Sequence, residues 1–183
     1  MQVAHNYEEQ GMRVLILKPK VDTKGSGDLV SRLGVRRPAD LLVPPDMDLV
    51  EAVRAASSEG RPLACVLCDE SQFLTAEQAE QLFMVTVELN IPVICYGLRA
   101  DFKGDLFPGS EALLVMADKI EEVKTICWCG RKATCNARVV DGRVVQEGEQ
   151  VVLGGNGQYV SLCRKHFRRG ELGDFKDLHL GED

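Results

Sequence analysis

Short apolar runs alternate with helix-like segments as far as residue 126. Residues 12–18, 63–68 and 92–96 are mainly apolar, which predicts strands buried on both faces. Shorter strands are expected near residues 40–43 and 121–126, and helices at residues 2–10, 47–58, 75–89 and 110–117. Buried strands that alternate with helices form parallel sheets covered by helices. We therefore expect an α/β fold, with a parallel sheet flanked by helices.

The third predicted helix carries the clearest start signal. Thr75 is expected to be its N-cap, with Glu77 and Gln78 in the first turn. A threonine followed three residues later by glutamine is the pattern of a capping box.

The pattern changes after residue 126. Residues 133–162 alternate apolar and polar positions around Asp141-Gly142, a dipeptide that favours a β-hairpin. We expect an α/β domain over residues 1–126, a small β-rich domain over residues 127–169 and a polar tail over residues 170–183.

The amino-acid composition and net charge argue against some classes of binding partner. The chain has 183 residues, 45% of them hydrophobic, and a net charge of -6. The negative charge argues against nucleic-acid binding, which needs a basic surface. No apolar run approaches the length of about 18 residues that a membrane helix needs, and the first residues lack the pattern of a signal peptide. Cys65, Cys68 and Cys95 lie in strand-like runs, which suits reduced thiols in a cytoplasmic protein.

The β-rich segment holds two close pairs of metal-binding residues. Cys127 and Cys129 form one pair, and Cys163 and His166 form the other. Thiolates and imidazole bind Zn²⁺ tetrahedrally, and four protein ligands leave no open position, so we expect a structural zinc site. The alternative is four residues that lie close by chance. Cys135 is expected to be a packing residue.

The second buried strand ends in Asp69-Glu70. An aspartate at the carboxyl end of such a strand can hold Mg²⁺, and an adjacent glutamate can take a proton from an attacking hydroxyl. The alternative is an ordinary turn with two solvated carboxylates. The pattern G-x-x-x-x-G-K-[ST], which would mark a phosphate-binding loop, does not occur in this sequence.

A series of ordered motifs resembles the zinc-containing type II thymidine kinases. The matching segments are residues 69–73, 96–102, 106–110, 124–133, 148–156 and 159–166. The resemblance extends over about residues 2–168. It implies ATP-dependent transfer of the γ-phosphoryl group to the 5′-hydroxyl of thymidine, with Mg²⁺ bound to ATP, a structural Zn²⁺, dTTP as a feedback inhibitor and a homotetramer.

The resemblance also implies roles for single residues. Glu70 matches the catalytic base, and Asp69 and Gln72 match positions near the nucleotide phosphates and metal. Ser71 replaces a small residue of the family pattern, and the expected cofactor-binding set is Asp69, Glu70, Ser71 and Gln72. The nucleoside is expected to contact Phe73, Leu98, Phe102, Phe107 and Tyr159, together with Val152, Leu153, Gly154, Gly155 and Asn156. Cys127, Cys129, Cys163 and His166 match the zinc ligands. Taken alone, the phenylalanines would rather be core residues.

The family pattern begins with a strand and a phosphate-binding loop that this sequence lacks. We therefore expect a P-loop-kinase-like fold that is incomplete at its N-terminus. Two other functions stay open at this point. The chain could bind nucleoside, or intact subunits, without catalysis. The basic run at residues 164–169 could contact nucleic acid, although the net charge argues against it.

Overall fold

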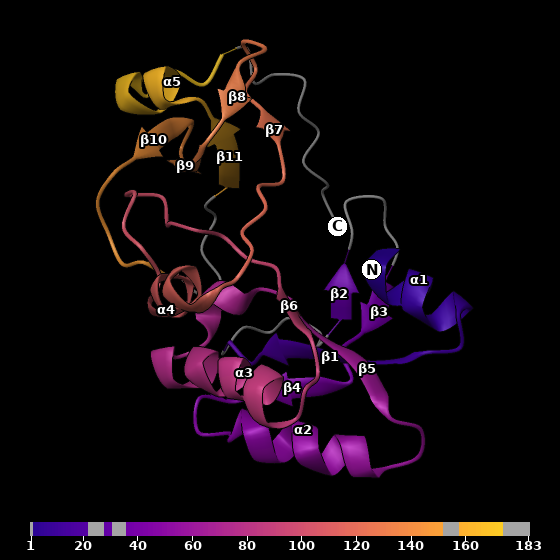
Figure 1. Cartoon of the computed structure of the whole chain (residues 1–183). Helices are drawn as coiled ribbons and strands as arrows, with labels where there is room; N and C mark the ends of the chain where they lie inside the picture. The colour runs from indigo at the N-terminus through magenta and orange to yellow at the C-terminus, as the bar shows by residue number, and fades with distance from the viewer. Residues whose placement is uncertain (1, 22–27, 31–35, 152–157, 174–183) are drawn as a thin grey trace. The chain divides into compact units, whose positions relative to one another are not determined.

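The computed structural model describes residues 2–21, 28–30, 36–151 and 158–173. The chain divides into two compact units (Figure 1). Unit 1 comprises Met1–Arg99 and Leu106–Ile120, and unit 2 comprises Ala100–Asp105 and Glu121–Asp183. The bounds of these units differ from those of the expected domains: the division falls at residue 120, the loop of residues 100–105 belongs to unit 2, and the expected tail is grouped with unit 2.

Unit 1 is built on a four-stranded parallel sheet in the order β4-β1-β5-β6. The strands are β1 (Arg13–Pro19), β4 (Leu41–Val43), β5 (Leu63–Cys68) and β6 (Val93–Cys95). The central strands β1 and β5 are almost continuously buried, as expected where helices cover both faces. Four of the five predicted strands and the α/β class are confirmed. The fifth strand, expected near residues 121–126, comprises only Thr125–Ile126 and belongs to an antiparallel pair in unit 2.

One detail of the sheet differs from the prediction. Residues 92–96 were expected to form a buried strand, but all three residues of β6 are only half-buried. Among the described residues β6 pairs only with β5 and forms the edge of the sheet.

Hydrogen bonding with the Cys95 thiol, together with burial, raises the pKa of the Cys68 thiol well above its ordinary value, so Cys68 stays protonated at neutral pH.

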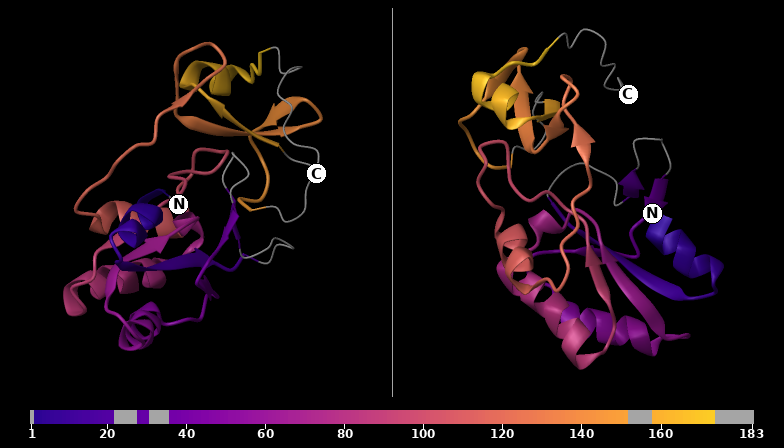
Figure 2. Two further views of the ribbon diagram at one scale, coloured as in Figure 1. Left: turned by 90° about the vertical axis from the view of Figure 1, so that its right-hand side faces the viewer. Right: turned by 45° about the horizontal axis from the view of Figure 1, so that its top comes forward.

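Helices cover the two faces of the sheet unequally. The helices are α1 (Gln2–Glu9), α2 (Leu49–Ser58), α3 (Ala76–Glu88) and α4 (Pro108–Met116). Side chains of α2 and α3, such as Val53 and Leu82, pack with Leu17 and Val66 in the larger core. Helix α1 lies on the opposite face (Figure 2), where Ala4 is buried in a second, smaller core.

Local signals explain where the longer helices begin. The Asp48 side chain accepts a hydrogen bond from the Glu51 N–H at the start of α2. At the start of α3 the predicted capping box is present, with reciprocal bonds between Thr75 and Gln78. A short antiparallel pair, β2 (Asp28–Val30) and β3 (Arg36–Pro38), was not predicted; the sequence there indicated only a loop.

Unit 2 contains small antiparallel sheets. Strand β9 (Cys135–Val140) lies between β10 (Arg143–Val145) and β11 (Gln158–Leu162). Strands β7 (Thr125–Ile126) and β8 (Lys132–Ala133) form a separate pair, and helix α5 (Arg164–Arg169) packs on β9 and β11 (Figure 2). The predicted hairpin is confirmed: β9 and β10 are joined by Asp141 and Gly142, both with positive φ, as a two-residue turn of this kind requires.

Among the described residues, none of the helices has the length and apolar character needed to cross a membrane.

We expect Thr75→Ala to lower the free energy of unfolding by about 1 kcal/mol. The substitution removes the hydroxyl that accepts a hydrogen bond from the Gln78 N–H. Urea unfolding followed by circular dichroism measures the change. Thr86→Ala is the matched control, because Thr86 lies inside the same helix and alanine is the better helix former there. Equal losses in the two variants would contradict a specific role for the cap.

Candidate active site and metal centre

The acidic pair follows directly after β5. The Asp69 N–H donates to the Leu17 carbonyl at 3.0 Å, so the pair begins at the carboxyl end of the sheet. Proteins with open parallel sheets bind their ligands at the carboxyl ends of the strands. Glu70 adopts a left-handed conformation, with φ 50° and ψ 36°. This conformation is uncommon outside glycine and costs about 1 kcal/mol or more.

Neighbouring hydrogen bonds hold Glu70 in this conformation. Both the backbone N–H and the Oγ of Ser71 donate to the Tyr96 carbonyl at 2.9 Å, and the Phe73 N–H donates to the Glu70 carbonyl at 3.0 Å. The turn is therefore tied to the chain that follows β6. Glu70 is exposed and Asp69 is half-buried, so both carboxylates face solvent at least in part.

Ser71 and Gln72 are placed differently from the two carboxylates. Both are buried, with exposed fractions of 3% and 1%. Ser71 donates to Tyr96, and the Gln72 amide bonds to the Glu70 carboxylate and to the Leu98 N–H. The polar atoms of both side chains are thus used inside unit 1.

Aromatic side chains gather beside this turn in unit 1. The rings of Phe73 and Phe107 meet edge to face, with centroids 5.7 Å apart, a favourable arrangement for two aromatic rings. Phe107 is buried at the start of α4, whereas Leu98 is exposed. The Oγ of Ser110 donates to the Leu98 carbonyl at 2.6 Å. Unit 1 therefore brings together three of the predicted nucleoside residues, Phe73, Leu98 and Phe107.

The remaining predicted nucleoside residues belong to unit 2. Phe102 is almost completely buried, and the Arg138 guanidinium lies over its ring, 5.4 Å from the centroid. Tyr159 is exposed on β11 and pairs in register with Arg138 on β9. Val152, Leu153, Gly154, Gly155 and Asn156 lie outside the described residues.

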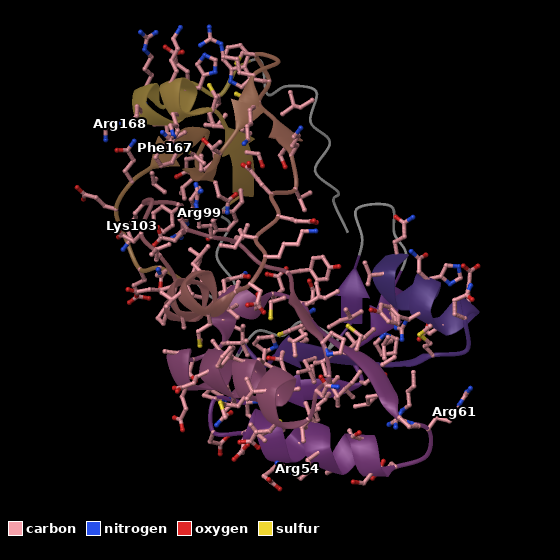
Figure 3. The ribbon with its side chains drawn as sticks, viewed as in Figure 1. Arg54, Arg61, Arg99, Lys103, Phe167 and Arg168 are labelled. Atoms are coloured by element: carbon pink, nitrogen blue, oxygen red, sulfur yellow. The ribbon has the colours of Figure 1, made fainter. Side chains whose placement is uncertain are left out.

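A buried carboxylate organises the loop that carries Phe102. Oδ1 of Asp101 accepts hydrogen bonds from the N–H groups of Lys103, Gly104 and Asp105 at 2.8–3.0 Å. Its Oδ2 accepts from the Gln150 side chain at 3.2 Å. The Lys103 ammonium, labelled in Figure 3, lies 4.0 Å from Oδ2. These donors replace the water that a buried carboxylate loses.

The four predicted metal ligands come together in unit 2. One ligand atom from each of Cys127, Cys129, Cys163 and His166 lies within 4.8 Å of the others. The Nδ1 atom of His166 is 3.4 Å from Cys127 Sγ and 3.5 Å from Cys163 Sγ. Three sulfurs and one nitrogen at this spacing are compatible with tetrahedral zinc. The predicted cluster is confirmed, and Cys135 is not part of it.

The surroundings of the cluster also suit a metal. The other ring nitrogen of His166, Nε2, lies 3.5 Å from a Glu171 carboxylate oxygen, the arrangement that orients a metal-binding histidine. Backbone N–H groups of His166 and Lys165 lower the pKa of the Cys163 thiol despite its burial, which favours the thiolate that binds metal. Trp128 stacks on the His166 ring, with centroids 4.3 Å apart.

Known proteins are similar to this chain over most of its length. The family model described as thymidine kinase matches residues 1–167. The chain belongs to the thymidine kinase family. A thymidine kinase from Salmonella paratyphi A is 50% identical over 98% of this chain and 89% of its own length. Thymidine kinases from Shewanella oneidensis and Ruegeria pomeroyi are 48% and 49% identical, each over 92% of this chain and over 88% and 85% of their own lengths.

Sequence reasoning missed several residues around the site of this thymidine kinase family member. Asp101, Arg138 and Gln150 were not singled out, although Asp101 followed by Gly104 and Asp105 is a recognisable turn signal. The contact of Trp128 with His166 was also missed, since it depends on how two distant segments meet. No pattern in the sequence indicates that Gln72 bonds to Glu70.

We expect Asp101→Ala to lower the free energy of unfolding by about 2 kcal/mol, because three backbone N–H groups lose the carboxylate acceptor and, among the described residues, only that of Gly104 keeps a second bond, to the Asp101 carbonyl. Hydrogen exchange should quicken at the amides of residues 103–105. Asp105→Ala is the control, since that side chain is 69% exposed and, within the described part of the chain, its one interaction is a surface ion pair with Lys103. Unchanged exchange in the Asp101 variant would contradict the role of its carboxylate.

We expect Cys163→Ser to lose bound zinc, whereas Cys135→Ser in the same unit keeps about one ion per chain. Native mass spectrometry measures the metal content. Trp128 is the only tryptophan and stacks on a ligand, so chelation should also change the tryptophan fluorescence, and added Zn²⁺ should restore it. Equal zinc contents in the two variants would contradict the assigned ligand set.

Proposed function

We propose that this chain is a thymidine kinase, which transfers the γ-phosphoryl group of ATP to the 5′-hydroxyl of thymidine and gives dTMP and ADP. The observation that carries the proposal is the similarity, at about half identity over nearly the whole chain, to proteins named thymidine kinase. The position of Glu70, exposed at the carboxyl end of β5, supports it.

Glu70 is proposed as the general base. As the 5′-oxygen of thymidine bonds to the γ-phosphorus, the Glu70 carboxylate takes the hydroxyl proton. The bond between the γ-phosphorus and the bridging oxygen breaks, and ADP leaves with that electron pair. Mg²⁺ bound with ATP would neutralise charge on the phosphates.

The residues proposed near the phosphates and metal are Asp69, Glu70, Ser71 and Gln72. The half-buried Asp69 and the exposed Glu70 have carboxylate oxygens that suit a magnesium ion or its water. Ser71 and Gln72 are buried, with their side chains bonded to neighbouring residues. Their proposed contribution is therefore to shape the turn on which the two carboxylates stand.

The residues proposed to contact the nucleoside come from both units. In unit 1 they are Phe73, Leu98 and Phe107, whose apolar surfaces suit a base or sugar. In unit 2 they are Phe102, Tyr159, Val152, Leu153, Gly154, Gly155 and Asn156. We propose that residues 127–169 work as one zinc-holding domain, in which Zn²⁺ is structural because all four ligands come from the chain.

Several further features of the proposal rest on the family. They are a homotetramer, inhibition by dTTP and a cytoplasmic location. None of the seven cysteines forms a disulfide, as in proteins of a reducing compartment.

We expect Glu70→Gln to reduce turnover by at least about a thousandfold, because the amide cannot accept the proton. Thymidine binding, measured by calorimetry, should survive, since the side chain keeps its size. Turnover is measured by coupling ADP formation to NADH oxidation. Glu77→Gln, an exposed glutamate in the first turn of α3, is the control.

Two outcomes would contradict parts of this proposal. Retained turnover in Glu70→Gln would exclude Glu70 as the base. Binding of thymidine without binding of ATP by the unmodified chain would exclude phosphoryl transfer and leave a nucleoside-binding protein.

A further inference from the structure

Among the described residues, the exposed Glu70 carboxylate has a buried hydrogen-bond partner in Gln72. The Gln72 Nε2 group donates to Glu70 Oε2 at 2.6 Å. An exposed glutamate otherwise samples several rotamers, and ordering such a side chain costs free energy. A short hydrogen bond to an ionised carboxylate is among the stronger hydrogen bonds in proteins.

The other end of the Gln72 amide is also fixed. Its Oε1 accepts from the Leu98 backbone N–H at 3.1 Å, and the side chain is only 1% exposed. A backbone N–H can only donate and an ionised carboxylate can only accept. The two partners therefore determine which way the amide points: nitrogen toward Glu70, oxygen toward Leu98.

The chain after β6 fits closely against this amide. A Cβ atom at Gly97 would lie 2.7 Å from Gln72 Oε1, 2.7 Å from Ser71 Oγ and 3.0 Å from the Gln72 backbone nitrogen. Only glycine allows the approach without a shift. Leu98 is held in turn by Ser110, whose Oγ donates to its carbonyl.

We propose that Gln72 is a positioning residue for the catalytic base: its buried amide connects Glu70 to Leu98 and thereby fixes the direction of the Glu70 carboxylate. This inference rests on the proposed function, in which Glu70 takes the proton of the thymidine hydroxyl. Gln72 acts through Glu70 and not by direct contact with nucleotide. A base must lie within hydrogen-bond reach of the proton, and a displacement of about 1 Å can cost about a hundredfold in rate.

The test replaces the amide by a group of similar shape that makes no hydrogen bond. We expect Gln72→Met to lower kcat by about 10- to 100-fold, with KM for thymidine and for ATP changed less than about twofold. Methionine keeps the volume and the apolar contacts but neither donates to Glu70 nor accepts strongly from Leu98. A merely structural defect would instead change the KM values and the melting temperature without a selective loss of kcat.

Gln78→Met is the matched control. Gln78 is also buried in unit 1, with a 3% exposed fraction, and its amide bonds to Pro44, Met47 and Thr75. The same substitution there should lower the melting temperature but leave kcat within about twofold. An equal fall in kcat for the two variants would overturn the proposal.

A second variant keeps the test decisive if Gln72→Met does not fold. Gly97→Ala keeps glutamine at position 72 but puts a methyl group against its amide oxygen. The amide must then shift, so kcat should fall at nearly constant KM. Unchanged kcat in a folded Gly97→Ala or Gln72→Met enzyme overturns the positioning role.

The double variant Glu70→Gln with Gln72→Met distinguishes a failure of the positioning role from a failure of the proposed function. If Gln72 acts through Glu70, adding Gln72→Met to Glu70→Gln should lower kcat no further. A further tenfold loss in the double variant would show an independent role of Gln72 and overturn the proposal. Full turnover by Glu70→Gln itself would instead remove the base assignment. An inactive Glu70→Gln variant beside a fully active Gln72→Met variant would remove only the positioning role.

Discussion

The parallel pairing of β5 with a neighbour on each side fixes where this chain places the Glu70 carboxylate, which we propose as the base. Cys68 is paired with Leu17 of β1 and with Cys95 of β6. The next residues therefore leave the sheet at a defined point, where Asp69 still bonds to Leu17 and Tyr96 still bonds to Cys68. Rigid strands give a more precise support than a free loop does. The turn that carries Glu70 derives its position from these three strands.

Unit 2 depends on a different interaction. Among the described residues its core is small, and two of the six buried residues in that core, Cys127 and Cys163, also belong to the candidate metal cluster. The described part of the unit has short strands and a six-residue helix, and small domains bury a smaller fraction of their surface than large ones. Zinc binding contributes folding free energy to small domains of this kind. The buried Asp101 adds a second fixed point by holding residues 100–105 and Gln150 in the same unit.

Much of the fold could be predicted from local pattern. Apolar runs identified β1 and β5 because both strands are buried on both faces, and Thr75 identified the start of α3 because capping is local chemistry. The metal ligands were predictable because two close pairs of rare residues suffice. The edge position of β6 was not predictable, since an apolar run does not reveal which strands flank it.

The candidate site was predictable only as a set of residues. Val152, Leu153, Gly154, Gly155 and Asn156 stay predictions, because they lie outside the described residues. The burial of Phe102 beneath Arg138 depends on the packing of distant segments. The bond between Gln72 and Glu70 depends on a left-handed turn, which a glutamate gives no reason to expect.

That turn connects stability with function in this family member. A left-handed glutamate costs free energy that a glycine would not, and the bonds from Ser71 to Tyr96 offset this cost. A glycine at the same position would relieve the strain but would remove the carboxylate. The conformation also turns the Glu70 side chain toward solvent while the next side chains, Ser71 and Gln72, turn inward. The proposed base and the buried amide proposed to orient it therefore lie two residues apart on one turn.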